Sequence, residues 1–197
     1  MTNNKRIDIT KLLTSLSIII GALLIAGAVG IIIAQADFSE KQSAQSVIRV
    51  MEETIPARKR ALPELHYGGD MPSAEIGGEN FVGLLEVEQY NCLFPVGTHW
   101  VESDLKRFPL SYSGNIYNRD LVIGGSSLDG QFDFVDEIEI GASVKFIDLY
   151  GHEFCYEVSM VNHAESIDTI QSEIDDLTLF AKSRNTSKYV IIRCRLS

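Results

Sequence analysis

The part of the chain that follows Asn80 predicts an all-β fold. Apolar residues alternate with polar ones in two clear runs, 154–160 and 190–196. Such a period of two is typical of strands with one buried face. Shorter runs of the same kind occur at 81–88, 91–96, 119–124, 143–149 and 177–182. Gly and Asn separate these runs, and only 164–174 has a helical pattern, so we expect a β-sandwich or a closed β-barrel.

The N-terminal region contains one long uncharged segment, residues 12–34. At about 1.5 Å per residue, this run is long enough to cross a hydrocarbon core of roughly 30 Å. Basic residues precede the run and acidic residues follow it: Lys5, Arg6, Lys11, Asp37 and Glu40. The positive-inside rule therefore predicts a cytoplasmic tail at 1–11, a transmembrane anchor at 12–35 and an extracellular remainder in the cell membrane.

A cleaved signal peptide is the alternative interpretation of the same segment. Ala34, Gln35 and Ala36 resemble a cleavage site with two small residues. The apolar run is much longer than the roughly 7–15 residues of a signal-peptide core, which favours the anchor.

A helical period follows the anchor. Apolar residues recur on one face of a helix: Ala44, Val47, Ile48, Met51 and Ile55. We predict a juxtamembrane amphipathic helix at 37–55, which Pro56 ends and which packs on the domain or lies on the membrane. Residues 56–78, with three Pro and two Gly pairs, are predicted to be a linker before a domain at 79–197.

The composition excludes several classes of function. A formal charge of −10 argues against nucleic acid as a partner, because phosphate binding needs clustered Lys and Arg. The three cysteines, Cys92, Cys155 and Cys194, are odd in number and lack metal-ligand spacing. We therefore predict no cofactor and no metal, and we expect Cys194 to be a core thiol.

Several stretches, in order along residues 71–197, resemble the sortase family, especially its class B and class D-like members. They resemble the family's strands and their connections, and they are 79–88, 91–96, 112–115, 120–123, 141–150, 153–158, 177–180 and 190–196. The resemblance implies a closed β-barrel of about eight strands. It also implies an enzyme that cleaves sorting signals of surface proteins through a Cys thioacyl intermediate, for attachment to the cell wall or to pili.

The residues that carry this chemistry in the family are all substituted. The family motif Ile-Ala-Gly-His falls on residues 123–126, so Ser126 stands where His is expected. The motif Leu-Thr-Leu-x-Thr-Cys falls on 177–182, so Ala181 replaces Thr and Lys182 replaces the nucleophilic Cys. The expected Arg aligns with Lys188, or with Tyr189 after a shift of one residue. Any substrate-binding role would then fall to Ser126, Ala181, Lys182 and Lys188.

Three hypotheses about function follow. The first is a non-catalytic sortase-like protein that binds a sorting signal, a surface protein or another sortase. The second is an active transpeptidase or hydrolase in which Lys182 is the general base for a Ser126 nucleophile. The third is a chain that keeps only the fold. We favour the first, because loss of a nucleophile alone costs on the order of 10⁶ in turnover.

Overall fold

The computed structural model describes residues 43–61, 69–127, 131–172 and 175–197. These residues belong to one compact unit, 41–197. The predicted cytoplasmic tail and the predicted anchor lie outside the described residues. Within the ranges given above, no helix is both long enough and apolar enough to span a membrane.

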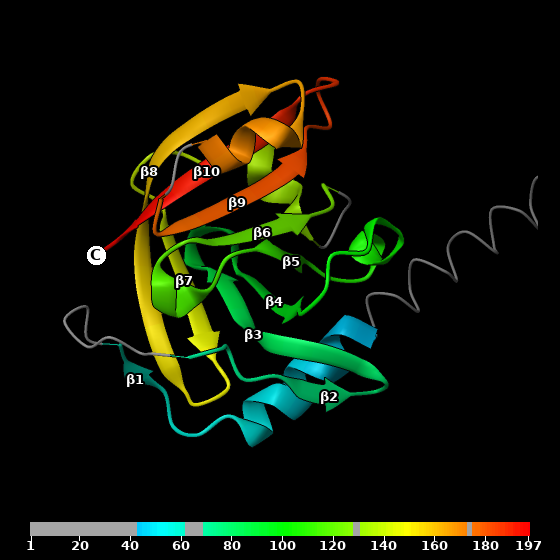
Figure 1. Cartoon of the computed structure of the whole chain (residues 1–197), viewed down its shortest axis with the longest axis vertical. Coiled ribbons are helices and arrows are strands. Elements are labelled where there is room, and N and C mark those ends of the chain that lie inside the picture. Colours follow the sequence, from blue (N-terminus) through cyan, green and yellow to red (C-terminus); the bar gives the residue numbers. More distant parts are fainter. Residues whose placement is uncertain (1–42, 62–68, 128–130, 173–174) are drawn as a thin grey trace, which may run out of the picture. The chain divides into compact units, whose positions relative to one another are not determined.

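Eight strands form a closed barrel (Figure 1). Around the barrel they are β3 (Glu79–Val87), β4 (Cys92–Gly97), β5 (Leu110–Ser113), β6 (Leu121–Gly125), β9 (Leu177–Lys182), β10 (Tyr189–Leu196), β8 (His152–Ala164) and β7 (Ser143–Asp148). Strand β7 pairs with both β8 and β3, and this double pairing closes the sheet on itself. The pairs β4–β5 and β6–β9 are parallel, and the others are antiparallel. The predicted barrel of about eight strands is confirmed.

Alternation along the strands fills the interior of the barrel. In β9, Leu177, Leu179 and Ala181 belong to the main core. In β10, the core side chains are Val190, Ile192 and Cys194, as the sequence predicts. Phe180 and Ile191 face outward and join a separate cluster. One face of β9 and β10 therefore packs inside the barrel, and the other packs in a cluster outside it.

Two short strands lie within the predicted linker, which is wrong at these residues. Strand β1 (Lys59–Arg60) runs parallel to β8, and β2 (Ala74–Ile76) pairs with β3. Gly77 and Gly78, with φ of 63° and 86°, form the turn between β2 and β3. Glycine adopts positive φ without a steric penalty, which explains this Gly pair. Both strands pair with backbone groups of β8 and β3. Strands of two or three residues are too short for their alternation to be recognised in the sequence.

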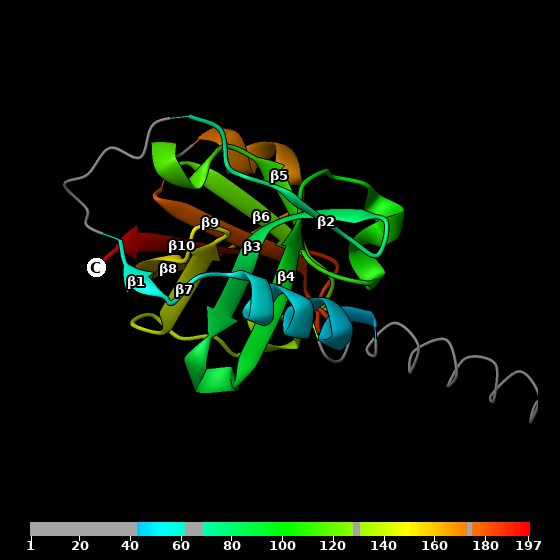
Figure 2. The same ribbon diagram turned by 90° about the horizontal axis from the view of Figure 1, so that it is seen from below.

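Residues 43–54 form the helix that precedes the barrel. Met51 is fully buried, and Val47 and Ile48 pack with it against the β3 residues Phe81 and Leu84. Figure 2 shows the helix on the outside of the barrel, beside β3 and β4. The described part of the predicted amphipathic helix therefore packs on the domain; residues 37–42 lie outside the described residues.

The helix predicted at 164–174 differs from the structure. Strand β8 continues to Ala164, and a 3-10 helix, η5 (Ile167–Ser172), follows it. The other 3-10 helices are η1 (Glu88–Tyr90), η2 (Glu102–Lys106), η3 (Ile116–Asn118) and η4 (Phe132–Asp136). Ile170 of η5 is buried against the outward cluster on β9 and β10. Tertiary packing of this side chain therefore selects the short, tight helix.

The turn between β7 and β8 is built on a buried carboxylate. Asp148 is fully buried and accepts hydrogen bonds from the Tyr117 hydroxyl at 2.8 Å and the Tyr150 amide at 2.9 Å. The amide of His152 and its ring Nδ1 also lie 2.8 Å from Asp148 oxygens. Both the amide and the ring of His152 therefore help to hold this turn together.

Candidate functional site

Strands β6 and β9 bring two of the predicted site residues to adjacent positions. The strands are parallel and in register from Leu121 opposite Leu177 to Gly125 opposite Ala181. Ser126 directly follows the last pair on β6, and Lys182 ends β9. Neighbouring strands lie about 4.8 Å apart. The two residues are therefore neighbours at the same end of the barrel.

Lys182 is exposed at this strand end. It points away from the core, because its neighbour Ala181 is fully buried inside the barrel and alternation turns Lys182 outward. In the part of the chain that the structure describes, its ammonium makes no hydrogen bond or ion pair. The Ser–Lys hypothesis needs a lysine held partly buried against the serine, and an exposed lysine does not meet that need.

Ser126 is half-buried and held through its backbone. Its amide donates to Oε1 of Gln131 at 3.4 Å, and its carbonyl accepts from the Phe132 amide at 2.9 Å. Gln131 is 6% exposed, and its Nε2 is a buried donor with no hydrogen-bond partner among the residues that the structure describes. Turning this amide over would set two donors against each other, so the bond to Ser126 determines its orientation. No pattern in the sequence points to Gln131.

Lys188 and Tyr189 are the two alternative positions for the third predicted site residue, the expected Arg. In the register of β9 and β10, Tyr189 is the residue opposite Lys182. Lys188 precedes the strand, and its ammonium forms an ion pair with Glu165 at 2.9 Å. Both partners of this pair are largely exposed, so it adds little to stability.

An aromatic cluster lies on the outer side of β6, β9 and β10. We call it the aromatic face and define it by four residues: Trp100, Tyr112, Phe180 and Tyr189. The Trp100 ring meets Tyr112 edge-on at 5.0 Å and lies 5.4 Å from Phe180. Tyr189 lies 6.3 Å from Phe180. Offset and edge-on arrangements at these distances are favourable for aromatic rings.

The aromatic face reaches β6 because Gly124 has no side chain. A Cβ there would lie 2.3 Å from the Trp100 ring and 2.6 Å from Phe180. Trp100 therefore lies directly over β6, two residues before Ser126. The sequence analysis missed this face; the one signal was the single tryptophan, which lies in the connection between β4 and β5.

The three thiols lie away from this strand end. Cys194 is fully buried in the core, and burial raises its pKa well above the usual range. Cys92 begins β4 and Cys155 lies on β8, and burial raises the pKa of each. A nucleophilic cysteine needs the opposite shift, toward the thiolate. None of the three is placed or activated as a nucleophile of the predicted site.

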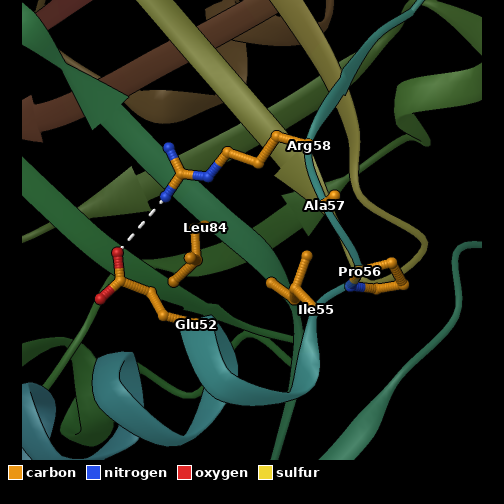
Figure 3. Close-up of a pocket in the computed structure, with 6 residues that line it drawn as sticks. All are labelled: Glu52, Ile55, Pro56, Ala57, Arg58 and Leu84. Carbon is orange, nitrogen blue, oxygen red and sulfur yellow. Dashed lines mark hydrogen bonds and ion pairs between the residues drawn. The ribbon is translucent and has the colours of Figure 1, made fainter.

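One hollow among the described residues lies elsewhere, under the end of the helix at 43–54. Its volume is about 200 Å³, and Figure 3 shows its lining: Glu52, Ile55, Pro56, Ala57, Arg58 and Leu84. The Arg58 guanidinium reaches Glu52 at 3.4 Å and Glu86 at 3.2 Å. Because these charges already satisfy one another, the hollow is a poor candidate for a charged ligand.

Comparison with known proteins identifies the fold. No family model matches the sequence, and no curated protein is significantly similar to it. Among solved structures, a lid mutant of sortase A from Corynebacterium diphtheriae matches with a TM-score of 0.52 and 17% identity, over 63% of this chain and 72% of that chain. Sortase C1 from Streptococcus agalactiae gives 0.51 and 15%, over 62% and 70%. Listeria monocytogenes sortase A gives 0.51 and 13%, over 59% and 87%.

The protein therefore has the sortase fold: a closed barrel of eight strands in which two parallel strands end side by side at the candidate site. The resemblance inferred from sequence is confirmed for the fold. At identities of 13–17%, the similarity defines architecture, and activity and partners are matters for proposal.

Proposed function

We propose that this chain is a sortase-fold protein without transpeptidase activity that binds a peptide sorting signal, a surface protein or a partner sortase. It acts outside the cell, anchored by residues 12–35 with its N-terminus in the cytoplasm. The site is the end of β6 and β9, with Ser126, Ala181, Lys182 and Lys188 around it.

The observation that carries this proposal is the absence of a thiol at the end of β9. Thioacyl chemistry needs a Cys thiolate near a proton donor and a group that stabilises the oxyanion. Lys182 holds the position that the resemblance assigns to this Cys, and Cys194 lies inside the barrel. In the aromatic face beside it Phe180 is buried, and the half-buried rings of Trp100, Tyr112 and Tyr189 offer apolar area to a bound peptide, which supports binding without chemistry.

A cleavage assay tests the proposal. The full-length chain in a mild detergent is incubated with fluorogenic peptides that cover several classes of sorting signal, with an active sortase run in parallel. We expect no cleavage above the blank, together with saturable binding of at least one peptide in a titration. Cleavage would overturn the lack of activity, and the absence of any saturable binding would favour a chain that keeps only the fold.

A second candidate is a hydrolase in which Ser126 is the nucleophile and Lys182 the general base. The parallel register of β6 and β9 supports it, because it makes the two residues neighbours. The exposure of Lys182 counts against it. If the cleavage assay detects turnover, Ser126→Ala and Lys182→Ala each abolish it under this candidate, whereas Ser127→Ala, the adjacent serine, does not.

A further inference from the structure

We infer that Lys182 binds the carboxylate of a peptide C-terminus whose preceding apolar residues lie on the aromatic face. This inference rests on the proposed function and names the form of peptide that the site accepts. It distinguishes a peptide that ends at the site from one that continues through it.

Charge is the first argument. The chain as a whole carries −10, yet residues 182–188 contain two Lys and one Arg and no acidic residue. Carboxylates of other elements already face part of this turn, because Glu165 pairs with Lys188 and Asp136 accepts from the Arg184 amide. The positive charge that remains to attract an anionic partner is therefore that of Lys182.

Lys182 differs from its cationic neighbours in the β9–β10 turn, which already have bonding partners. Lys188 is paired with Glu165 at 2.9 Å, and the Arg184 guanidinium donates to the Asp133 carbonyl at 3.0 Å. The Arg184 amide also donates to Asp136 at 2.9 Å, so this residue holds the turn against η4. Among the residues of the turn that the structure describes, Lys182 is the cation without such a bond. Its ammonium is available to a ligand.

The third argument is the position of Lys182 at the end of an apolar surface. Phe180 lies two residues earlier on the same side of β9, and Tyr189 lies opposite Lys182 on β10. Trp100, Tyr112 and Tyr189 are half-buried and keep part of their rings exposed. Beyond Lys182 the turn is polar. A ligand that is apolar along the face and anionic at its end fits this order of side chains.

These observations favour a terminal carboxylate over an acidic side chain within a longer peptide. The apolar side chains stop at Lys182, so the apolar part of the ligand stops there as well. The turn that follows is closed by its own hydrogen bonds, since the Ser183 hydroxyl accepts from the amides of Asn185 and Thr186. Together with the Arg184 amide, which donates to Asp136, these amides are engaged and do not pair with a continuing peptide.

The test uses each sorting-signal peptide of the panel in three forms: with a free C-terminal carboxylate, as the C-terminal amide, and extended by two glycine residues. Binding to the full-length chain is followed by the emission of Trp100, the single tryptophan, which lies in the proposed site. We expect the free acid to bind roughly fivefold more tightly than the amide, near the upper end for an exposed ion pair. Raised salt is expected to reduce this preference.

Matched variants assign the preference to Lys182. Lys182→Gln is expected to abolish the difference between acid and amide, and Lys182→Arg to retain it. Lys59→Gln makes the same change of charge at an exposed residue of β1, near the other end of β8, and is expected to leave the preference unchanged. Far-UV circular dichroism of each variant checks that it is folded.

Each outcome decides between the two levels of proposal. Equal binding of acid, amide and extended peptide would overturn the inference and leave the proposed function standing. No saturable binding of any form would overturn both. The inference would also be overturned if the chain bound phosphatidylglycerol vesicles in place of peptide acids and the Lys182→Gln variant lost this binding. The anion at Lys182 would then be a lipid phosphate.

Discussion

At the scale of single residues, the thiols show how environment decides chemistry. Burial raises the pKa values of Cys92, Cys155 and Cys194, and Cys194 is the most strongly affected. The charged form of an acid is disfavoured where water is excluded. Each of the three side chains is therefore held as the thiol. Cys194 acts as a small apolar group in the core, whereas Cys92 donates to the Tyr90 carbonyl and Cys155 to the Glu153 carboxylate.

Thiol alkylation tests this state. We expect iodoacetamide to label Cys92 and Cys155 of the native protein more slowly than free cysteine at neutral pH. Because their pKa values are raised, the thiolate and the rate increase only as the pH rises beyond the usual thiol range. Cys194 is expected to react only after unfolding, which peptide mapping by mass spectrometry detects. A thiol that is labelled faster than free cysteine at pH 7 would contradict our account.

Gly124 is a second residue whose environment makes a sharp prediction. Gly124→Ala places a Cβ 2.3 Å from the Trp100 ring, so the ring must move. Overpacking of this kind costs about 1–3 kcal/mol, measured as the loss of unfolding free energy in urea. In a Trp100→Ala background the same change is expected to cost less, because the space is then open. Equal costs in both backgrounds would show that Trp100 is not the neighbour that matters.

At the scale of elements, the helix at 43–54 is stabilised by one face. Met51 is fully buried between this helix and the barrel, whereas Val50, one residue earlier, is 42% exposed. An amphipathic helix derives most of its stability from such packing, since short helices are marginal in water. The contact ties the segment next to the predicted anchor to the barrel.

Substitution at these two positions tests the contribution of the helix. Met51→Ala is expected to lower the unfolding free energy by about 2–5 kcal/mol, through lost burial and a residual cavity. Val50→Ala is the matched control and is expected to change it by at most about 0.5 kcal/mol. Both values come from urea titrations followed by circular dichroism. Similar effects of the two variants would mean that the helix does not pack through Met51.

At the scale of the whole molecule, closure of the barrel through β3 and β7 gives each of the eight barrel strands two neighbours. The aromatic face takes Tyr112 from β5, Phe180 from β9 and Tyr189 from β10, so it depends on the same hydrogen-bonded sheet as the core. Small domains with one continuous core usually unfold in a single cooperative step. The candidate site is therefore expected to melt together with the barrel.

Two probes report on this cooperativity. The emission of Trp100 follows the aromatic face, and far-UV circular dichroism follows the strands. We expect the two signals to give the same midpoint in urea. A fluorescence transition at lower urea would show instead that the face opens before the barrel unfolds.

The sequence predicted most of the barrel and part of the site. Strands β9 and β10 were found close to their observed bounds, because a buried and an exposed face leave a period of two. The run predicted at 154–160 covers only the middle of β8, which spans His152–Ala164. Strand β5 was missed, since its four residues, Leu-Ser-Tyr-Ser, are half polar. The assignment of site residues to Ser126 and Lys182 came from order along the chain, and it stays a prediction.

By itself the sequence determined the all-β class, the inward side chains of the main strands and the lack of a cysteine at the end of β9, because each follows from residue type and local period. The tertiary structure alone decided the rest. Three features join residues that are far apart in the chain. They are the closure through β7, the parallel register that makes Ser126 and Lys182 neighbours, and the aromatic face. Such contacts depend on which strands pair, and pairing depends on packing of the whole barrel, which no local period encodes.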